Sequence, residues 1–453
     1  AVIMEYPYVD KVYRNSYYQY YASKNNGAYR DCIRLSFLKK EISAETLRGK
    51  DAAVTLQEVY LGYMIVRPTP TSIVGRSAIS PLAKGNDLSI CLAPMTSTMA
   101  GVKLGVNAFP HSSQDSETLS CAETTIWSLM EYYSTKYPDY RPVLPADIIE
   151  VLAASTSERQ LPSAGLSIPQ IAFALKKFGF GPRIYTAAAD PENFQAIVST
   201  YIESGIPLIA ALSSKDNSIR HANLIVGRKI FTTEHLEKLE STNVSDLEID
   251  NELREKDFKY FDFHQIRRSY IFNDDNCPTY QLAEFDHPCK HYGIPVWASC
   301  QIFSIATPLY HKMYLEAAVS RRYIELFLFK VMQVQNNRSS ILTRLFMASS
   351  RSYKHYLAVH SEMDSGLRNA LLDLEMAKFI WVCELSTKEL LGKHQADGFV
   401  IIDATEINYQ SQECLMAAYC DGQLIIKPDK HNLENFKLTL SPFSIYEENL
   451  KSA

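Results

Sequence analysis

The clearest hydrophobic pattern along the chain predicts a helix that begins at Cys121. Ser120 and Glu123 have the spacing of a capping box, in which side chains satisfy the free backbone N–H groups at a helix start. Cys121 is therefore expected to be the first helical residue, where the helix dipole stabilises a thiolate. The apolar residues that follow recur on one face of a helix: Ala122, Ile126, Leu129, Met130 and Tyr133.

Two more helices are predicted downstream by the same start and stop signals. Ser167 precedes Gln170 by three residues, and Gly179 is placed to end that helix. Asp190 followed by a proline predicts the start of the next helix, and Gly205 predicts its end.

Three strands are expected after these helices, over residues 206–212, 221–230 and 269–274. The first two are nearly continuous apolar runs, which is typical of strands buried on both faces. The acidic segment 235–257 lies between the second and third strands and is expected to form an exposed helix and loop.

The segments on either side also mix helix and strand signals. Segment 29–48 is expected to be helical, and strands are expected over 60–68 and 87–94. A long amphipathic helix is expected over 314–334, and residues 369–385 are expected to run from helix into strand. The chain is therefore predicted to be α+β with three domains: 1–105, 106–300 and 301–453.

Composition narrows the classes of function. The chain has 453 residues, of which 46% are hydrophobic and 21% charged, with a net charge of −5. An acidic balance gives no reason to expect nucleic acid as a partner. No run of about 18 apolar residues predicts a membrane span, and the N-terminus lacks a signal-peptide pattern. Nine scattered cysteines argue against a disulfide framework, so a reducing, cytoplasmic location is expected.

A nucleophilic cysteine needs a base, and the base needs an orienting group. His221 stands at the start of a buried strand, and histidine can accept and return a proton near neutral pH. Asp274 ends the next strand and is our first choice for orienting the imidazole, with Asp275 as the alternative. Gln114 could donate an amide to an oxyanion. Ordinary explanations also exist, because histidines end strands and aspartates form turns without any catalytic role.

The stretch from Gln114 to about residue 280 resembles the papain-like cysteine peptidase fold. It is most similar to the bacterial double-glycine-leader (bacteriocin-processing) peptidase group. The stretches that carry this resemblance are 120–133, 165–180, 203–212, 221–228 and 270–275.

The resemblance implies a central domain of N-terminal helices packed on an antiparallel sheet, flanked here by two α+β domains. It also implies a Cys-His-Asp triad of Cys121, His221 and Asp274, with Gln114 in the oxyanion hole. Such an enzyme hydrolyses a peptide or protein substrate through a thioester and needs no cofactor. The chain departs from the family at Ala122, where glycine is usual, and its glutamine lies one residue farther from the cysteine.

Other interpretations use the same residues or their neighbours. The triad could transfer an acyl group to an amine, or the fold could be a non-catalytic scaffold. Four basic residues are expected to form either a basic patch or a solvated helix face: Arg338, Arg344, Arg351 and Lys354. A zinc site is the last alternative, but its spacing lacks the close pairs of known zinc sites, so no metal is predicted. Its candidate ligands are Cys277, His287, Cys289 and His291.

Overall fold

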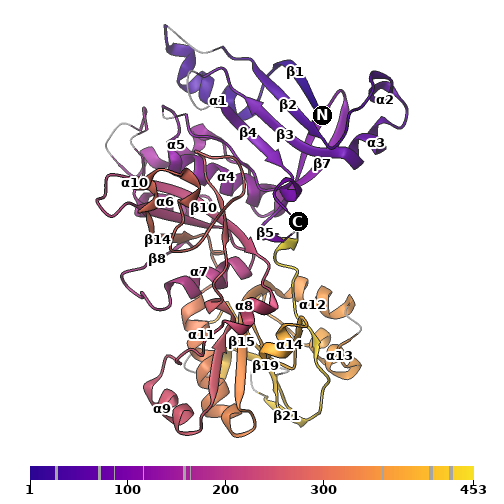
Figure 1. Ribbon diagram of the computed structural model, residues 1–453, viewed down its shortest axis with the longest axis vertical. Helices are drawn as coiled ribbons and strands as arrows, with labels where there is room; N and C mark the ends of the chain where they lie inside the picture. Colours follow the sequence, from indigo (N-terminus) through magenta and orange to yellow (C-terminus); the bar gives the residue numbers. More distant parts are fainter. Residues whose placement is uncertain are drawn as a thin grey trace.

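The computed structural model describes residues 1–25, 29–69, 73–85, 87–115, 117–156, 160–163, 165–359, 362–407, 412–427 and 432–452. It confirms the α+β class, since helices accompany each of the large sheets. Figure 1 shows three parts arranged along the long axis, with the helix α4 in the middle part and the C-terminal sheet at the far end from β1. A helix with the length and apolar character needed to cross a bilayer does not occur among the described residues.

The N-terminal part is an antiparallel sheet in the order β1-β2-β3-β4 with a separate β6–β7 hairpin. Its elements are β1 (Val2–Tyr8), α1 (Lys11–Gln19), β2 (Cys32–Leu38), α2 (Ala44–Arg48), α3 (Ala52–Val59), β3 (Tyr60–Val66), β4 (Val74–Ile79), β6 (Ala93–Met99) and β7 (Val102–Ala108).

The helix predicted over 29–48 is wrong in its first half, where the structure has β2. Every second side chain of β2 is buried, including Arg34 and Ser36. Arg34 donates from Nε to Glu5 on the neighbouring strand at 2.7 Å, which compensates for burying its charge. The period-two pattern was therefore hidden in the sequence, because two of the buried residues are polar. Helix appears only from Ala44.

The helices predicted for the central part are present, but the helix predicted to start directly after Asp190 begins at Phe194. The glycines predicted to end two of them have positive φ angles, +99° at Gly179 and +70° at Gly205. At Gly205 a Cβ atom would lie 2.6 Å from the backbone oxygen of Asn449, so a larger residue does not fit. The helices of this part are α4 (Cys121–Lys136), α5 (Pro145–Ala153), α6 (Ile168–Lys177), α7 (Phe194–Glu203), α8 (Thr233–Glu237), α9 (Leu247–Glu255) and α10 (Pro295–Ala298).

The central sheet has the order β13-β12-β10-β9-β14-β8, and β5 joins it by pairing with β10. β9 and β10 are buried along nearly their whole length, as their apolar runs predicted. Helix α4 packs against β10, so the first turn of that helix lies beside the start of this strand. The strands are β5 (Leu88–Ile90), β8 (Arg183–Thr186), β9 (Leu208–Ser213), β10 (Arg220–Lys229), β12 (Tyr270–Asn273), β13 (Gln281–Ala283) and β14 (Gln301–Thr307).

The C-terminal part contains a sheet in the order β11-β15-β16-β18-β19-β20-β21. Its strands are β11 (Lys259–Asp262), β15 (Ser340–Ser349), β16 (Phe379–Ser386), β18 (Gly398–Asp403), β19 (Leu415–Cys420), β20 (Gln423–Ile426) and β21 (Glu434–Lys437). Its helices are α11 (Ala317–Leu326), α12 (Ser350–Val359), α13 (Ser365–Asp373) and α14 (Lys388–Leu391), and two short strands, β17 (Gln395–Ala396) and β22 (Phe443–Ser444), pair with each other.

Sheet membership crosses the domain limits at residues 105 and 300 that the sequence predicted. Strand β14 lies beyond residue 300 but belongs to the central sheet, whereas β11 lies before it and pairs with β15. The last strand, β23 (Lys451–Ser452), returns from the C-terminal part and pairs with β5. In Figure 1 the C-terminus accordingly lies beside β5.

The expected basic patch or solvated helix face at residues 338–354 is also corrected. Arg344 lies on the buried strand β15, and Arg338 pairs with Asp397 at 3.0 Å and with Asp421 at 2.5 Å. Among the four predicted residues only Arg351 and Lys354 lie on a helix, α12. The segment runs along the buried strand β15 and into α12, where Arg351 is exposed.

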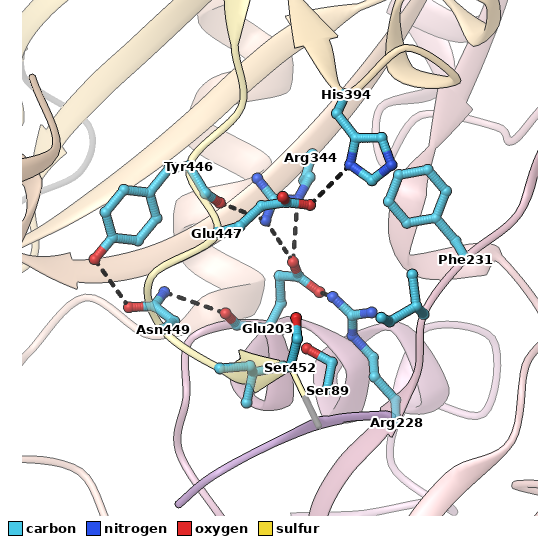
Figure 2. Close-up of a pocket in the computed structure, with 12 residues that line it drawn as sticks. Ser89, Glu203, Arg228, Phe231, Arg344, His394, Tyr446, Glu447, Asn449 and Ser452 are labelled. Carbon is cyan, nitrogen blue, oxygen red and sulfur yellow. Dashed lines mark hydrogen bonds and ion pairs between the residues drawn. The ribbon is translucent and has the colours of Figure 1, made fainter. Parts of the chain in front are cut away.

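A buried ionic network joins the central and C-terminal parts, and Figure 2 shows it around Glu203. The Glu203 carboxylate, at the end of α7, accepts from Arg344 Nη2 at 2.6 Å and also from Arg228 on β10. Arg344 also donates from Nη1 to Glu384 on β16 at 2.6 Å. Asn449 in the C-terminal tail donates to the backbone oxygen of Glu203 at 3.1 Å. Glu203 is 4% exposed, so its charge has little access to water and depends on these partners.

Replacing Glu203 with alanine should therefore destabilise the folded chain strongly. The change would leave Arg228 and Arg344 buried without their shared carboxylate, at a cost of about 3–5 kcal/mol. Glu234→Ala is the control, because Glu234 is exposed and its partner Lys238 is exposed too. Denaturant unfolding followed by fluorescence should show a large loss for the first variant and an unchanged midpoint for the second. Equal midpoints would contradict this account of the network.

Candidate active site

Cys121 is the first residue of α4, as the capping pattern predicted. Glu123 accepts from the backbone N–H of Ser120 at 3.1 Å, and its second oxygen accepts from the Ser163 hydroxyl at 2.5 Å. Cys121 itself is partly exposed, whereas the next residue, Ala122, is buried. The sulfur therefore stands at a fixed helix start that is open to solvent on one side.

The loop that leads into α4 is held by the buried carboxylate of Asp115. Its Oδ1 accepts from the backbone N–H groups of Glu117 at 3.0 Å, Thr118 at 2.7 Å and Leu119 at 2.9 Å. Arg67, from the N-terminal part, donates to the backbone oxygen of Ser113 at 3.0 Å. The N-terminal part thus helps to hold the loop that leads into α4 and Cys121.

The structure brings Cys121, His221 and Asp274 together. His221 is the second residue of β10, and its Nε2 lies 3.0 Å from Oδ1 of Asp274, which directly follows β12. The Cys121 side chain lies beside the imidazole, where it helps to raise the pKa of His221, and both residues line the same cleft. A helix start, a strand start and a strand end therefore supply one side chain each to a single cluster.

Asp274 is fully buried and receives donors from several segments. Besides His221, Tyr292 donates its hydroxyl to Oδ1 at 2.9 Å, His291 Nε2 lies 3.2 Å from Oδ2, and the Asn276 backbone N–H donates at 3.1 Å. Burial alone would raise the pKa of Asp274, but the hydrogen bonds from His221 and His291 hold that pKa well below its usual range. Asp274 is therefore an ionised acceptor.

The protonation of His221 follows from the same contacts. Burial by itself lowers the pKa of His221, but the hydrogen bond with Asp274, the neighbouring Cys121 side chain and the charges of Asp274 and Asp275 raise it well above its usual value. A protonated imidazole beside a thiol stabilises the thiolate. The arrangement therefore favours a protonated imidazole beside the Cys121 sulfur.

Asp275, the alternative acid, lies close to His221 but does not make a hydrogen bond with it. Its Oδ1 is 3.7 Å from His221 Nε2, and neither carboxylate oxygen has a hydrogen-bond partner among the described residues. Burial raises the pKa of Asp275 to about 7; the charge of His221 opposes this rise and that of Asp274 adds to it. Asp274, not Asp275, therefore makes the hydrogen bond that orients the imidazole.

Sequence reasoning missed the aromatic cover over the His221–Asp274 pair. Tyr292 and Trp297 stack with ring centres 3.9 Å apart, and the Trp297 ring meets the His221 ring edge-on at 5.3 Å. Both residues belong to the segment between β13 and β14, far along the chain from either partner. The available signal was a cluster of aromatic residues and histidine at 291–297, but no spacing rule connects such a loop to a strand end.

Gln114 lies beside the loop that follows Asp274. Its Nε2 donates to Asn276 Oδ1 at 2.6 Å, and Asn276 in turn donates to the Tyr292 hydroxyl at 3.1 Å. It does not belong to the described residues that line the cleft at Cys121. The backbone N–H of Cys121 is a second candidate donor, because the first N–H groups of a helix have no partner within it. The oxyanion role of Gln114 thus stays a prediction.

A cleft of about 920 Å³ opens at Cys121 and His221. Its walls come from Leu166 in the loop before α6, from Ile168 at the start of α6, and from Phe303 on β14. Lys215 and Arg220 lie at its edge, in and after the turn between β9 and β10. The cleft leads directly to the sulfur and combines apolar walls with a basic rim.

The four zinc ligands considered from the sequence do not come together as a set. His287 is exposed, and Cys289 is buried beside Cys300. Instead, Cys277 and His291 lie near Asp274, with one ligand atom from each residue within 4.8 Å of the others. His221, Asp274 and Asp275 satisfy the same distance criterion.

Replacing Asp275 with asparagine should change how stability depends on pH. The folded pKa of about 7 lies above the usual aspartate value of about 3.9, so Asp275 stabilises the fold at low pH and loses this contribution as pH rises through 7. Asparagine stays neutral throughout. The melting temperature of Asp275→Asn minus that of the unsubstituted chain should increase between pH 5 and pH 8 and then level off. A difference that is independent of pH would show that Asp275 is ionised throughout.

Comparison with known proteins does not assign this chain to a family. No model of a protein family matches it, and no curated protein matches it. What the site can do chemically therefore has to be argued from its own residues and their geometry.

Proposed function

We propose that the protein is a thiol hydrolase that cleaves amide bonds in a peptide or protein substrate. The observation that supports this function most directly is the hydrogen-bonded pair His221–Asp274, with Cys121 and His221 both lining an open cleft. Each residue type suits its position, because a thiolate attacks, an imidazole transfers the proton and a buried carboxylate holds the ring.

In the first half of the reaction, the Cys121 thiolate attacks the carbonyl carbon of the scissile amide. The carbonyl oxygen becomes an oxyanion, to which the backbone N–H of Cys121 at the helix start can donate a hydrogen bond. The His221 imidazolium then gives its proton to the leaving amine, and the C–N bond breaks. The products of this half are a free amine and a thioester on Cys121.

In the second half, water hydrolyses the thioester. Neutral His221 takes a proton from water, the hydroxide attacks the thioester carbonyl, and the C–S bond breaks to release the acid. Asp274 stays ionised throughout, because its buried carboxylate keeps its donors in both halves. Its task is to hold the imidazole between the sulfur and the reacting group.

The cleft supports an extended substrate. Its volume of about 920 Å³ exceeds what a single side chain fills, and its apolar residues Leu166, Ile168 and Phe303 offer contacts along it. Lys215 and Arg220 at the rim favour acidic groups near the scissile bond. The nine cysteines are all unpaired, which is consistent with the predicted reducing, cytoplasmic setting as part of this proposal.

Cys121→Ala should abolish amide hydrolysis while the protein stays folded. The thiol is partly exposed, so removing its sulfur leaves only a small change in packing, and the melting temperature should stay nearly constant. Cys420→Ala, on β19 in the C-terminal sheet, is the matched control and should keep full activity. Fluorogenic peptides with acidic and apolar residues provide the assay. Activity that persists without Cys121 would place the nucleophile elsewhere.

Alkylation should distinguish the two partly exposed cysteines, Cys121 and Cys277. Burial and the charges of Asp274 and Asp275 raise the pKa of the Cys277 thiol to about 11, so little thiolate forms there at pH 7. The His221 imidazolium stabilises the thiolate at Cys121 instead. Iodoacetamide at pH 7, followed by peptide mass mapping, should modify Cys121 about tenfold faster or more.

His221→Gln is the control for this labelling experiment, because it removes the imidazolium and keeps a hydrogen-bonding side chain. The preference for Cys121 should then largely disappear. Equal labelling of both cysteines in the unsubstituted protein would count against the ion pair.

A further inference from the structure

A second set of side chains that could bind a metal ion shares Asp274 with the candidate triad. Asp274, Cys277 and His291 each offer one ligand atom, and these atoms lie within 4.8 Å of one another. Cys277 belongs to the turn that follows β12, where its backbone N–H donates to the backbone oxygen of Asp274 at 3.1 Å. His291 comes from the short helix η4 (Lys290–Tyr292). Two separate segments therefore meet at one carboxylate.

We propose that Asp274, Cys277 and His291 bind a single zinc ion, or a similar borderline transition-metal ion, and that this ion inhibits the enzyme. Thiolate, imidazole and carboxylate are the ligands that zinc takes in proteins. The thiolate and the imidazole exclude magnesium and calcium, which prefer an all-oxygen shell. Three protein ligands leave a fourth position for water.

The accessibility of the three residues suits reversible binding. The side chain of Asp274 is fully buried and that of His291 is 7% exposed, whereas Cys277 is partly exposed. An ion can therefore approach from the Cys277 side and reach the two buried ligands behind it. On binding, the Cys277 thiol loses its proton to solvent and the sulfur coordinates as thiolate.

The bonding of His291 is a second observation that indicates a ligand. Its Nε2 contacts Asp274 Oδ2 at 3.2 Å, while its Nδ1 is buried and has no hydrogen-bond partner among the described residues. A buried imidazole nitrogen without a partner is costly in a folded protein. Because no described residue holds that nitrogen, the ring is free to change tautomer, which coordination through one nitrogen requires.

Inhibition follows from the shared carboxylate, and this part of the inference rests on the proposed function. Asp274 accepts from His221 through Oδ1 and from His291 through Oδ2. An ion bound to this carboxylate competes with His221 for it, so the imidazole loses the partner that holds its ring toward Cys121. Metal binding at Asp274 therefore inhibits hydrolysis, although neither Cys121 nor His221 belongs to the proposed ligand set.

The metal site is tested first without any activity measurement. Cobalt(II) is the probe, added to the Cys121→Ala protein so that the candidate nucleophile cannot act as a ligand. One ion per chain should bind and give the near-ultraviolet band of a thiolate–cobalt bond, and zinc should displace it. Adding Cys277→Ser should remove the band and weaken binding by about 100-fold.

His287→Ala in the same background is the matched control. His287 is an exposed histidine near the site in sequence but outside the ligand set, so its removal should leave the band and the affinity unchanged. His291→Gln, with folding checked by melting temperature, should weaken binding as Cys277→Ser does. Binding that persists without Cys277, or that depends on His287, would overturn the site.

The inhibitory role is tested separately with the catalytically intact chain. Zinc should suppress hydrolysis in the unsubstituted protein, and Cys277→Ser, compared with its own metal-free rate, should need about 100-fold more zinc. Equal sensitivity of both proteins would place inhibition at Cys121 or at the set His221, Asp274 and Asp275, and would overturn the inhibitory role. Cobalt binding without any hydrolysis in metal-free buffer would refute the proposed function while the metal site stands.

Discussion

The buried carboxylate of Asp274 is the interaction on which the geometry of the candidate site depends. It stands one residue beyond β12, and the antiparallel pairing of β12 with β10 brings it beside His221. Hydrogen bonds from His221, Tyr292, His291 and the Asn276 backbone satisfy it. A fully buried carboxylate is tolerable only with such donors, so the loops that supply them are constrained by its charge.

The neighbouring acid shows how strongly this effect depends on contacts rather than on sequence. Asp275 is almost equally buried, but its oxygens have no hydrogen-bond partner among the described residues, and its pKa is raised to about 7. Two adjacent aspartates therefore have pKa values on opposite sides of the ordinary one. One acts as a charged acceptor for the imidazole, and the other is largely protonated below neutral pH.

The flanking parts of the chain are tied to the central part from both sides. On the N-terminal side, Nδ1 of the buried His111 lies 3.0 Å from Asn273 Oδ1. The same asparagine donates to the backbone oxygen of Pro110, and the two contacts together fix the end of β12. On the C-terminal side, Glu203 ties α7 to β15 through Arg344. A site made at the ends of elements needs such anchors, because strand ends and helix starts are otherwise the least constrained parts of a fold.

The sequence by itself determined the features that depend on neighbouring residues. The helix start at Cys121, the helix ends at Gly179 and Gly205, and the buried runs of β9 and β10 all follow from capping, backbone freedom or local hydrophobicity. The sequence also predicted which residue types form the candidate triad, in their order along the chain. Tertiary structure decided the choice between Asp274 and Asp275, the cover by Tyr292 and Trp297, and the strand β2 with its buried Arg34. Each of these depends on contacts between segments far apart in sequence, whose pairing leaves no local pattern.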